Sequence, residues 1–159
     1  MHHLAQINIA RFRLPSAHPA NADFMNALDE VNAVAEAQEG FIWRLKGEGD
    51  NAIDLRPYPD PQVAVNMSLW RDLDALAAFV YRNPAHWAIM RRRREWFAHM
   101  DVYLALWWVE AGRIPRVEDG KAAIETLTRL GPTPAAFTFK TPFPPPGEGR
   151  VRPVLDACA

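Results

Sequence analysis

The order in which strand-like and helix-like hydrophobic patterns follow one another most constrains the fold of this sequence. In several segments apolar and polar side chains alternate, which is typical of a strand with one buried face. In others apolar side chains recur every three or four positions, which is typical of an amphipathic helix. In chain order we predict strand 4–13, helix 21–39, strand 41–46 and strand 63–70. A helix then begins at residue 73, is interrupted at Asn83-Pro84 and resumes over 85–100, and strand 102–109 follows it.

The order strand, helix, strand, strand, helix, strand is the ferredoxin-like split βαβ plan, an α+β fold. It predicts an antiparallel sheet with helices on one face, and we expect a further helix over 116–130 and a further strand over 135–141. The chain has 159 residues, of which 49% are hydrophobic and 23% charged, which suits one globular domain. We assign residues 1–141 to a single domain and residues 142–159, which are rich in proline, to a C-terminal tail.

Composition argues against several classes of partner. The formal net charge is −1, with 18 basic and 19 acidic residues, so no basic field predicts binding to nucleic acid or to an anionic membrane. No apolar stretch reaches the roughly 18 residues of a transmembrane helix, and the first residues lack the pattern of a signal peptide. The one cysteine, Cys158, allows no intrachain disulfide. We therefore expect a protein of the reducing cytoplasm that binds neither nucleic acid nor membrane.

One face of the predicted sheet carries both large apolar and polar side chains. If the helices cover the opposite face, this mixed face would expose a large apolar patch in a monomer. We therefore expect two copies to join through their sheets as a homodimer around a partly polar cavity. Amide and hydroxyl groups in such a cavity can orient a carbonyl or a quinol hydroxyl of a ligand, or they can bond to one another. The residues on this face are Leu4, Phe12 and Trp70 together with Gln6, Asn8, Asn66 and Ser68.

The helix predicted over 85–100 places two polar side chains, His86 and Arg93, on an apolar stripe. Burial of the stripe, worth about 1.5–3 kcal/mol per large side chain, is expected to turn both inward. His86 can be a core histidine bonded to a backbone carbonyl, a general base near neutral pH or an axial haem ligand. Arg93 can close a buried ion pair or bind an anionic group such as a haem propionate. The apolar residues of the stripe are Ile89, Met90, Trp96, Phe97 and Met100.

Six segments of the sequence, in order, resemble an uncharacterised bacterial family of the dimeric α/β-barrel superfamily. They are LAQINIARFR (4–13), VNMSLW (65–70), FVYRNPAH (79–86), RRRREWF (91–97), LWWV (106–109) and GPTPAAFTF (131–139), and the resemblance spans residues 3–146. It implies a dimeric α/β barrel with a pocket between sheet and helices. The superfamily includes cofactor-free antibiotic-biosynthesis monooxygenases and haem-dependent proteins, so the resemblance specifies no single reaction.

The haem-degrading members of that superfamily use an asparagine, a tryptophan and a histidine. Asn8 lies on the first strand, as this resemblance implies. Met90 stands where their helix histidine is expected, so the haem-degrading activity does not carry over residue by residue.

Three functions are compatible with these residues. The first is an oxygenase-like enzyme, either cofactor-free or haem-dependent, with His86 and Asn8 as catalytic residues and with His86 as a metal ligand only if haem is bound. The second is a non-enzymatic module that holds a small hydrophobic or aromatic molecule, and the third is a structural dimer whose pocket is filled by its own aromatic residues. The further residues expected to contact a ligand are Arg93, Asn66, Ser68, Trp70, Met90 and Phe97.

The segment 47–62 is too long for a tight turn and is rich in glycine, aspartate and proline. Loops of this length and composition often cover binding sites. We expect this one to be a mobile cover over one mouth of the pocket.

Overall fold

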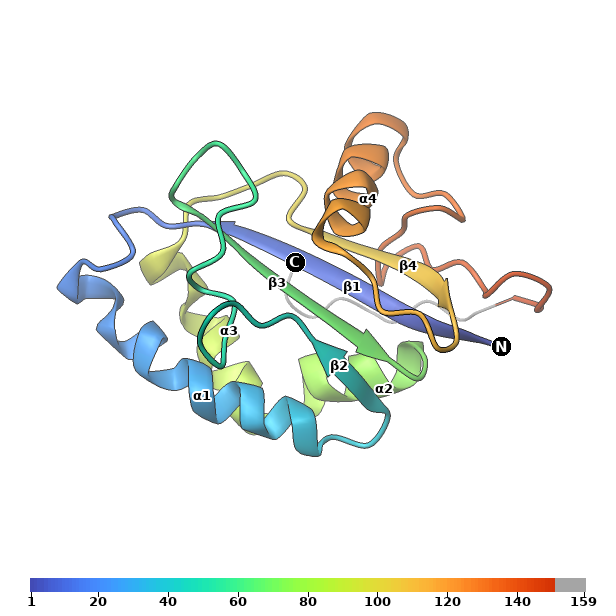
Figure 1. Ribbon diagram of the computed structural model, residues 1–159, viewed down its shortest axis with the longest axis horizontal. Helices are drawn as coiled ribbons and strands as arrows, with labels where there is room; N and C mark the ends of the chain where they lie inside the picture. Colours follow the sequence, from blue (N-terminus) through green and yellow to red (C-terminus); the bar gives the residue numbers. More distant parts are fainter. Residues whose placement is uncertain (151–159) are drawn as a thin grey trace.

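Within the described part of the chain, residues 1–150, four strands form one antiparallel sheet (Figure 1). They are β1 (His2–Arg11), β2 (Phe41–Arg44), β3 (Val63–Trp70) and β4 (Leu104–Glu110), in the spatial order β2-β3-β1-β4. This computed structural model confirms the predicted α+β fold with an antiparallel sheet. The part of the predicted tail beyond residue 150, with Cys158, lies outside the described residues.

Short polar residues and proline set where two of the helices begin. Asp72 and Asn83 each accept hydrogen bonds from backbone N–H groups of the following turn, and Pro84 occupies the first turn after Asn83. None of the helices in residues 1–150 combines the length and the apolarity that a membrane crossing requires. The helical segments are the 3-10 turn η1 (Pro19–Asn21), α1 (Ala22–Ala37), α2 (Leu73–Ala77), the π-helical turn η2 (Ala78–Arg82), α3 (Pro84–Trp96) and α4 (Val117–Leu130).

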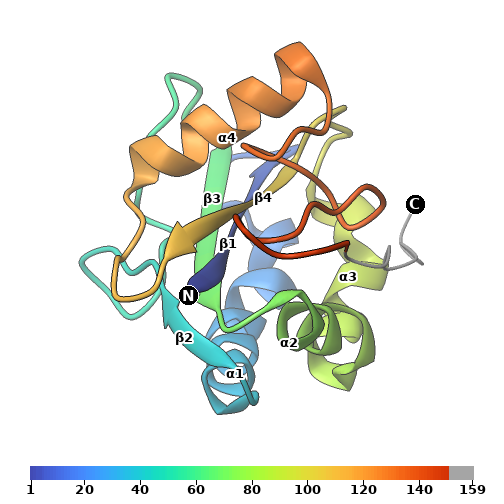
Figure 2. The ribbon, with the colours of Figure 1, turned by 90° about the vertical axis from the view of Figure 1, so that its right-hand side faces the viewer.

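Helices cover both faces of the sheet (Figure 2). On one face the strand residues Ile7, Val65 and Met67 share a hydrophobic core with Ile124 and Leu127 of α4. The opposite face, which carries Leu4, Trp70 and the polar side chains, turns toward α1, α2 and α3. Because side chains alternate along a strand, the packing of α4 on the apolar face directs the polar set toward the other helices.

The helices of the split βαβ plan, α1 to α3, lie on one face as expected, and the further helix α4 covers the opposite face. The mixed face that we expected to meet a second sheet is covered within one chain, and Phe12 and Trp70 are each only 1% exposed. The sequence predicted the helix that became α4, but its pattern did not show which face this helix covers. The homodimer stays a prediction, now without the exposed patch that motivated it.

The helix predicted to reach residue 100 ends at Trp96. Phe97 instead pairs with Phe12 in an isolated bridge, and the N–H of Ala98 donates to the carbonyl of Arg11 at 2.9 Å. These bonds attach the chain after α3 to the end of β1. The free backbone groups at that strand end compete successfully with one more helical turn.

The last predicted strand, 135–141, is absent from the described sheet, where Phe137 makes a single bridge to Leu106. Phe137 is nevertheless fully buried, so the two-residue spacing of Phe137 and Phe139 indicated burial rather than a strand. Just beyond it, the indole N–H of Trp108 donates to the carbonyl of Phe143 at 2.8 Å. The first residues of the predicted tail thus pack against β4.

The close approach of α4 to the sheet depends on Gly120. A Cβ atom at this position would lie 2.8 Å from Ile7 Cδ1 and 3.0 Å from Met67 Sδ. We predict that Gly120→Val lowers the free energy of unfolding by about 1–3 kcal/mol, because the added carbons overpack the interface. The measurement is urea denaturation.

The matched control for that substitution is Ala122→Val, at an exposed position of the same helix. It changes helix propensity without meeting the sheet, so its effect should stay below about 1 kcal/mol. Equal losses in the two variants would contradict a tight contact at Gly120.

Candidate functional site

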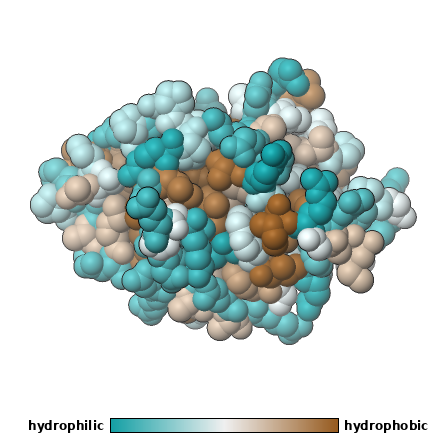
Figure 3. Space-filling view, viewed as in Figure 1, coloured by the Kyte–Doolittle hydropathy of each residue, from teal (hydrophilic) through white to brown (hydrophobic). Residues whose placement is uncertain are grey.

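A cavity of about 220 Å³ lies between the polar face of the sheet and the helices α1 and α3. Loop residues 51–53 close part of it, and Figure 3 shows hydrophobic side chains in a recess between hydrophilic ones on this side of the molecule. The structure brings together the eight residues that the sequence singled out as catalytic or ligand-contacting. The cavity is lined by Asn8, Asn66, Ser68 and Trp70 from the sheet, by His86, Met90 and Arg93 from α3, and by Phe97 directly after α3.

Polar side chains on β1 and β3 form a connected group on the floor of the cavity. Gln6 lies opposite Ser68 in the strand register, and its Nε2 donates to Ser68 Oγ at 2.9 Å and to Asn66 Oδ1 at 2.7 Å. The indole N–H of Trp70 donates to the same Ser68 oxygen at 2.8 Å. The side chain of Asn8, opposite Asn66, has no hydrogen-bond partner among the described residues. Most of the polar set thus bonds internally, which the sequence had left as one alternative.

His86 lies in the first turn of α3, where its Nδ1 is 3.0 Å from the carbonyl oxygen of Val80 in η2. A carbonyl can only accept, so Nδ1 carries the hydrogen and donates it. Burial lowers the pKa of His86 below its ordinary value, and the Val80 carbonyl opposes this shift. The imidazole is therefore neutral near pH 7, and its Nε2 keeps a lone pair with no partner among the described residues.

Arg93 lies two turns further along α3, about 10 Å along the helix axis. Its guanidinium lies over the ring of Tyr103, 4.4 Å from the centroid, and is half-buried. The nearest acid in sequence, Glu95, bonds to Arg92 instead. No described carboxylate pairs with Arg93, so the ion pair that the sequence allowed is not formed in residues 1–150.

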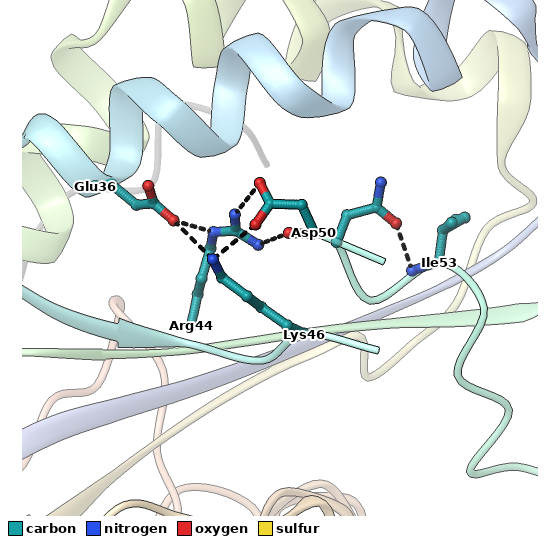
Figure 4. Close-up of polar contacts among 6 residues, drawn as sticks. Glu36, Arg44, Lys46, Asp50 and Ile53 are labelled. Carbon is teal, nitrogen blue, oxygen red and sulfur yellow. Dashed lines mark hydrogen bonds and ion pairs between the residues drawn. The ribbon is translucent and has the colours of Figure 1, made fainter. Parts of the chain in front are cut away.

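Arg44 fixes the loop that closes the cavity (Figure 4). Its side chain is only 5% exposed and bonds to Glu36 of α1 at 2.8 Å, to the Asp50 carboxylate at 3.0 Å and to the Asp50 backbone carbonyl. Lys46 adds a bond to Asp50 at 2.7 Å. The loop 47–62 therefore covers the cavity as predicted, and it is tied to both the sheet and α1; its mobility stays a prediction.

Sequence reasoning did not single out Arg44 and Tyr103, which also line the cavity. Arg44 lies between Trp43 and Leu45 in an alternating strand, where a charged residue ordinarily indicates a side facing solvent. Tyr103 lies at the start of the predicted strand 102–109, where the pattern indicates a strand but not a contact with the cavity. The available signal for Arg44 was the pair of acids on either side of it in sequence, Glu36 and Asp50, which could balance a buried cation.

A haem does not fit this cavity. Its volume of about 220 Å³ is below the roughly 300–1,000 Å³ typical of sites for drug-sized ligands, and haem is larger than most of these. His86 has the arrangement of an axial ligand, since a carbonyl holds Nδ1 and leaves Nε2 free. Across residues 1–150, no group of three or more His, Cys, Asp or Glu side chains is placed to hold a metal ion. We therefore assign no haem to the cavity.

Comparison of the sequence with protein families decides the relationship. A family described as "Domain of unknown function (DUF3291)" matches residues 3–153. The chain belongs to DUF3291. No curated protein matches it.

Solved structures similar to this DUF3291 chain have low sequence identity to it. A protein from Shewanella oneidensis is 10% identical over 68% of this chain and 91% of its own, with a TM-score of 0.50. The cofactor-independent oxygenase SnoaB from Streptomyces nogalater is 18% identical over 73% of this chain and 100% of its own, with a TM-score of 0.49. A protein of unknown function from Nitrosomonas europaea is 15% identical over 73% and 97%, with a TM-score of 0.48. The similarity is one of fold.

The half-buried, neutral imidazole of His86 predicts a specific pH dependence of stability. Because its folded-state pKa is below the unfolded value, about 6.5, the unfolded chain binds more protons as the pH falls. Its contribution to the free energy of unfolding is complete above that pH and is lost as the pH falls below it. We predict a shallower loss of stability between pH 7 and pH 5 in His86→Phe, measured by urea denaturation.

The other histidines remain in both proteins and act as the internal control for that comparison. They are His2, His3, His18 and His99. If the free energy of unfolding of His86→Phe falls between pH 7 and pH 5 as steeply as that of the wild type, the folded protein does not hold His86 as a neutral base.

The ties of Arg44 to the loop predict how the cavity opens. In Asp50→Ala, Arg44 and Lys46 lose a carboxylate, so we expect faster amide hydrogen exchange over 47–54 and the first proteolytic cut within 47–62. Glu48→Ala, which removes an exposed carboxylate from the same loop, is the control and should leave both rates unchanged. Protection of this loop equal to that of β1 in both variants would contradict a movable cover.

Proposed function

We propose that the cavity binds a small aromatic molecule and holds it as a conjugated oxyanion, a phenolate or an enolate. The observation that carries this proposal is the guanidinium of Arg93, which lines a mainly apolar cavity and pairs with no described carboxylate. Removing a charge from water without a partner is costly, so an anionic ligand is favoured there. The contact with Tyr103 offsets part of that cost.

His86 supplies the complementary group, a neutral base. Its Nε2 carries a lone pair and can take a proton from a ligand hydroxyl or from an acidic carbon. Because Arg93 lies about 10 Å along α3 from His86, the negative charge is stabilised best when it spreads over a conjugated ring system. The charged or titratable side chains that line the cavity, among the described residues, are Arg44, His86, Arg93 and Tyr103.

The size of the cavity favours a ligand of one or two rings. Its volume of about 220 Å³ lies below the range for drug-sized molecules. Aromatic and aliphatic side chains from α1 and α3 provide flat apolar walls, among them Phe24, Leu28, Ile89 and Phe97. This supports a small planar ligand.

An anion of this kind can react with dioxygen without a cofactor. At a CH₂ carbon beside a carbonyl, one atom of dioxygen becomes a new carbonyl oxygen, and the other leaves as water with the two hydrogens. The protein then needs only to remove the first proton and to hold the anion, which are the roles given to His86 and Arg93. We therefore favour a cofactor-free oxygenase-like activity.

The second candidate is a binding module that holds the anion without chemistry. The small number of reactive groups favours this module, because His86 is the one histidine among the described lining residues. Oxygen uptake with 1,3-indandione, whose CH₂ group lies between two carbonyls, separates the two. Uptake that His86→Phe abolishes supports the enzyme, and tight binding without uptake supports the module.

The ionisation of bound 1,3-indandione tests the anion site directly. An arginine beside the ligand should lower the pH at which it ionises by about one to three units, as opposite charges do for titrating groups. We predict that Arg93→Met removes most of this shift, measured by the visible absorbance of the enolate. The control is Arg91→Met, which removes an exposed charge of the same helix.

Two results would contradict the proposal. One is a ligand that ionises at the same pH with and without wild-type protein. The other is a shift that Arg91→Met reduces as much as Arg93→Met, since this would assign the effect to the general charge of α3.

A further inference from the structure

Ser68 is a buried hydroxyl whose two acceptor positions are already occupied. Its side chain faces the cavity from β3 and is 7% exposed. Gln6 Nε2 donates to its oxygen at 2.9 Å and Trp70 Nε1 donates at 2.8 Å. A serine hydroxyl has one hydrogen to give and two lone pairs to accept with. Its own hydrogen is therefore what remains, and no described residue accepts it.

The two groups that donate to Ser68 are themselves held in place. Gln6 is 5% exposed and also bonds to Asn66, while the Trp70 ring is 1% exposed. Trp70 packs edge-on against Phe41 at 5.4 Å and stacks on Phe79 at 5.3 Å. Because neither donor can turn away easily, the direction of the Ser68 hydrogen is fixed by the fold rather than chosen by rotation.

Ser68 also lies at the His86 end of the cavity. The His86 ring contacts Phe79 at 4.6 Å, Phe79 stacks on Trp70, and Trp70 bonds to Ser68. This chain of contacts places the Ser68 hydroxyl of the sheet and the free Nε2 of His86 on α3 around the same aromatic pair, Trp70 and Phe79. Arg93 lies two turns away on α3.

We propose that Ser68 is the fixed hydrogen-bond donor that receives the oxygen of the ligand as His86 removes its proton. The inference rests on the proposed function and narrows it. The preferred ligand carries a carbonyl, enolate or phenolate oxygen at the end that meets the sheet, while Arg93 stabilises the charge spread toward the other end. A donor held in advance toward a developing negative charge requires no rearrangement when the charge forms.

This arrangement also determines which molecules the cavity rejects. An aromatic hydrocarbon of the same shape leaves the buried Ser68 hydrogen without an acceptor, and a site built around such a donor discriminates against ligands that lack the oxygen. Ser68 is therefore a specificity-determining residue of the site.

The experiment compares two probes, 1,3-indandione and indane, which share the fused ring shape and differ in the carbonyl oxygens. In Ser68→Ala, the affinity for the indandione enolate should fall about tenfold to a hundredfold, the value of one buried hydrogen bond to a charged group. The affinity for indane should not fall. Ser68→Thr, which keeps the hydroxyl, should retain most of the affinity for the enolate.

Trp70→Phe gives a second test that leaves the serine in place. It keeps an aromatic ring against Phe79 but removes the N–H that occupies one lone pair of Ser68, so the hydroxyl can turn. We expect a smaller loss of enolate affinity, again without loss for indane. This variant decides the question if Ser68→Ala does not fold.

The outcomes separate this inference from the proposed function. If Arg93→Met weakens enolate binding and neither Ser68→Ala nor Trp70→Phe does, the role of Ser68 is overturned and the anion site stands. If Ser68→Ala weakens both probes equally, its role is structural and the inference is also overturned. If the wild-type protein neither binds the enolate nor shifts its ionisation, the proposed function itself fails.

Discussion

Both faces of one small sheet are buried within a single chain, and the cavity depends on this constraint. Helix α4 lies close to the apolar face because Gly120 leaves room for Ile7 and Met67 beneath it. Strand side chains alternate, so fixing Ile7 and Met67 against α4 turns Gln6 and Ser68 to the other side. If that side of the sheet faced solvent, water would hydrate these polar side chains. Under α1 and α3 they become the floor of a cavity instead.

The polar side chains of the sheet lie beneath apolar side chains of the helices, so they are partly shielded from water. Each buried polar group must find a partner, and on this sheet the residues largely satisfy one another through the bonds among Gln6, Asn66, Ser68 and Trp70. Among the described lining residues the Asn8 amide has no partner, and three further groups are left over: the hydroxyl hydrogen of Ser68, the Nε2 of His86 and the guanidinium of Arg93. The Ser68 hydroxyl is a hydrogen-bond donor, His86 is a base and Arg93 is a cation. This set suits the proposed ligand, an acidic enol or phenol that binds as its oxyanion.

Much of this arrangement could be predicted from local pattern. The alternation over 63–70 predicted β3 with its bounds, and the shared stripe of His86 and Arg93 placed both residues in the cavity. The position of α4 could not be predicted in the same way, because an amphipathic helix shows that it has an apolar face but not which sheet face it covers. The end of α3 was also hidden, since it depends on a backbone pairing with Phe12 that lies far away in sequence.

The cavity contains two arginines whose surroundings differ, and this difference supports the proposed anion site. Arg44 is almost fully buried and has two carboxylates and a carbonyl as partners, as a structural cation requires. Arg93 is half-buried on an aromatic ring, although Asp23 and Glu95 lie close enough to its neighbour Arg92 to bond there. The fold thus supplies acids where a cation is needed for stability and directs the available acids away from Arg93. Leaving a cation unpaired lowers stability, and natural proteins tolerate such a cost mainly at functional sites.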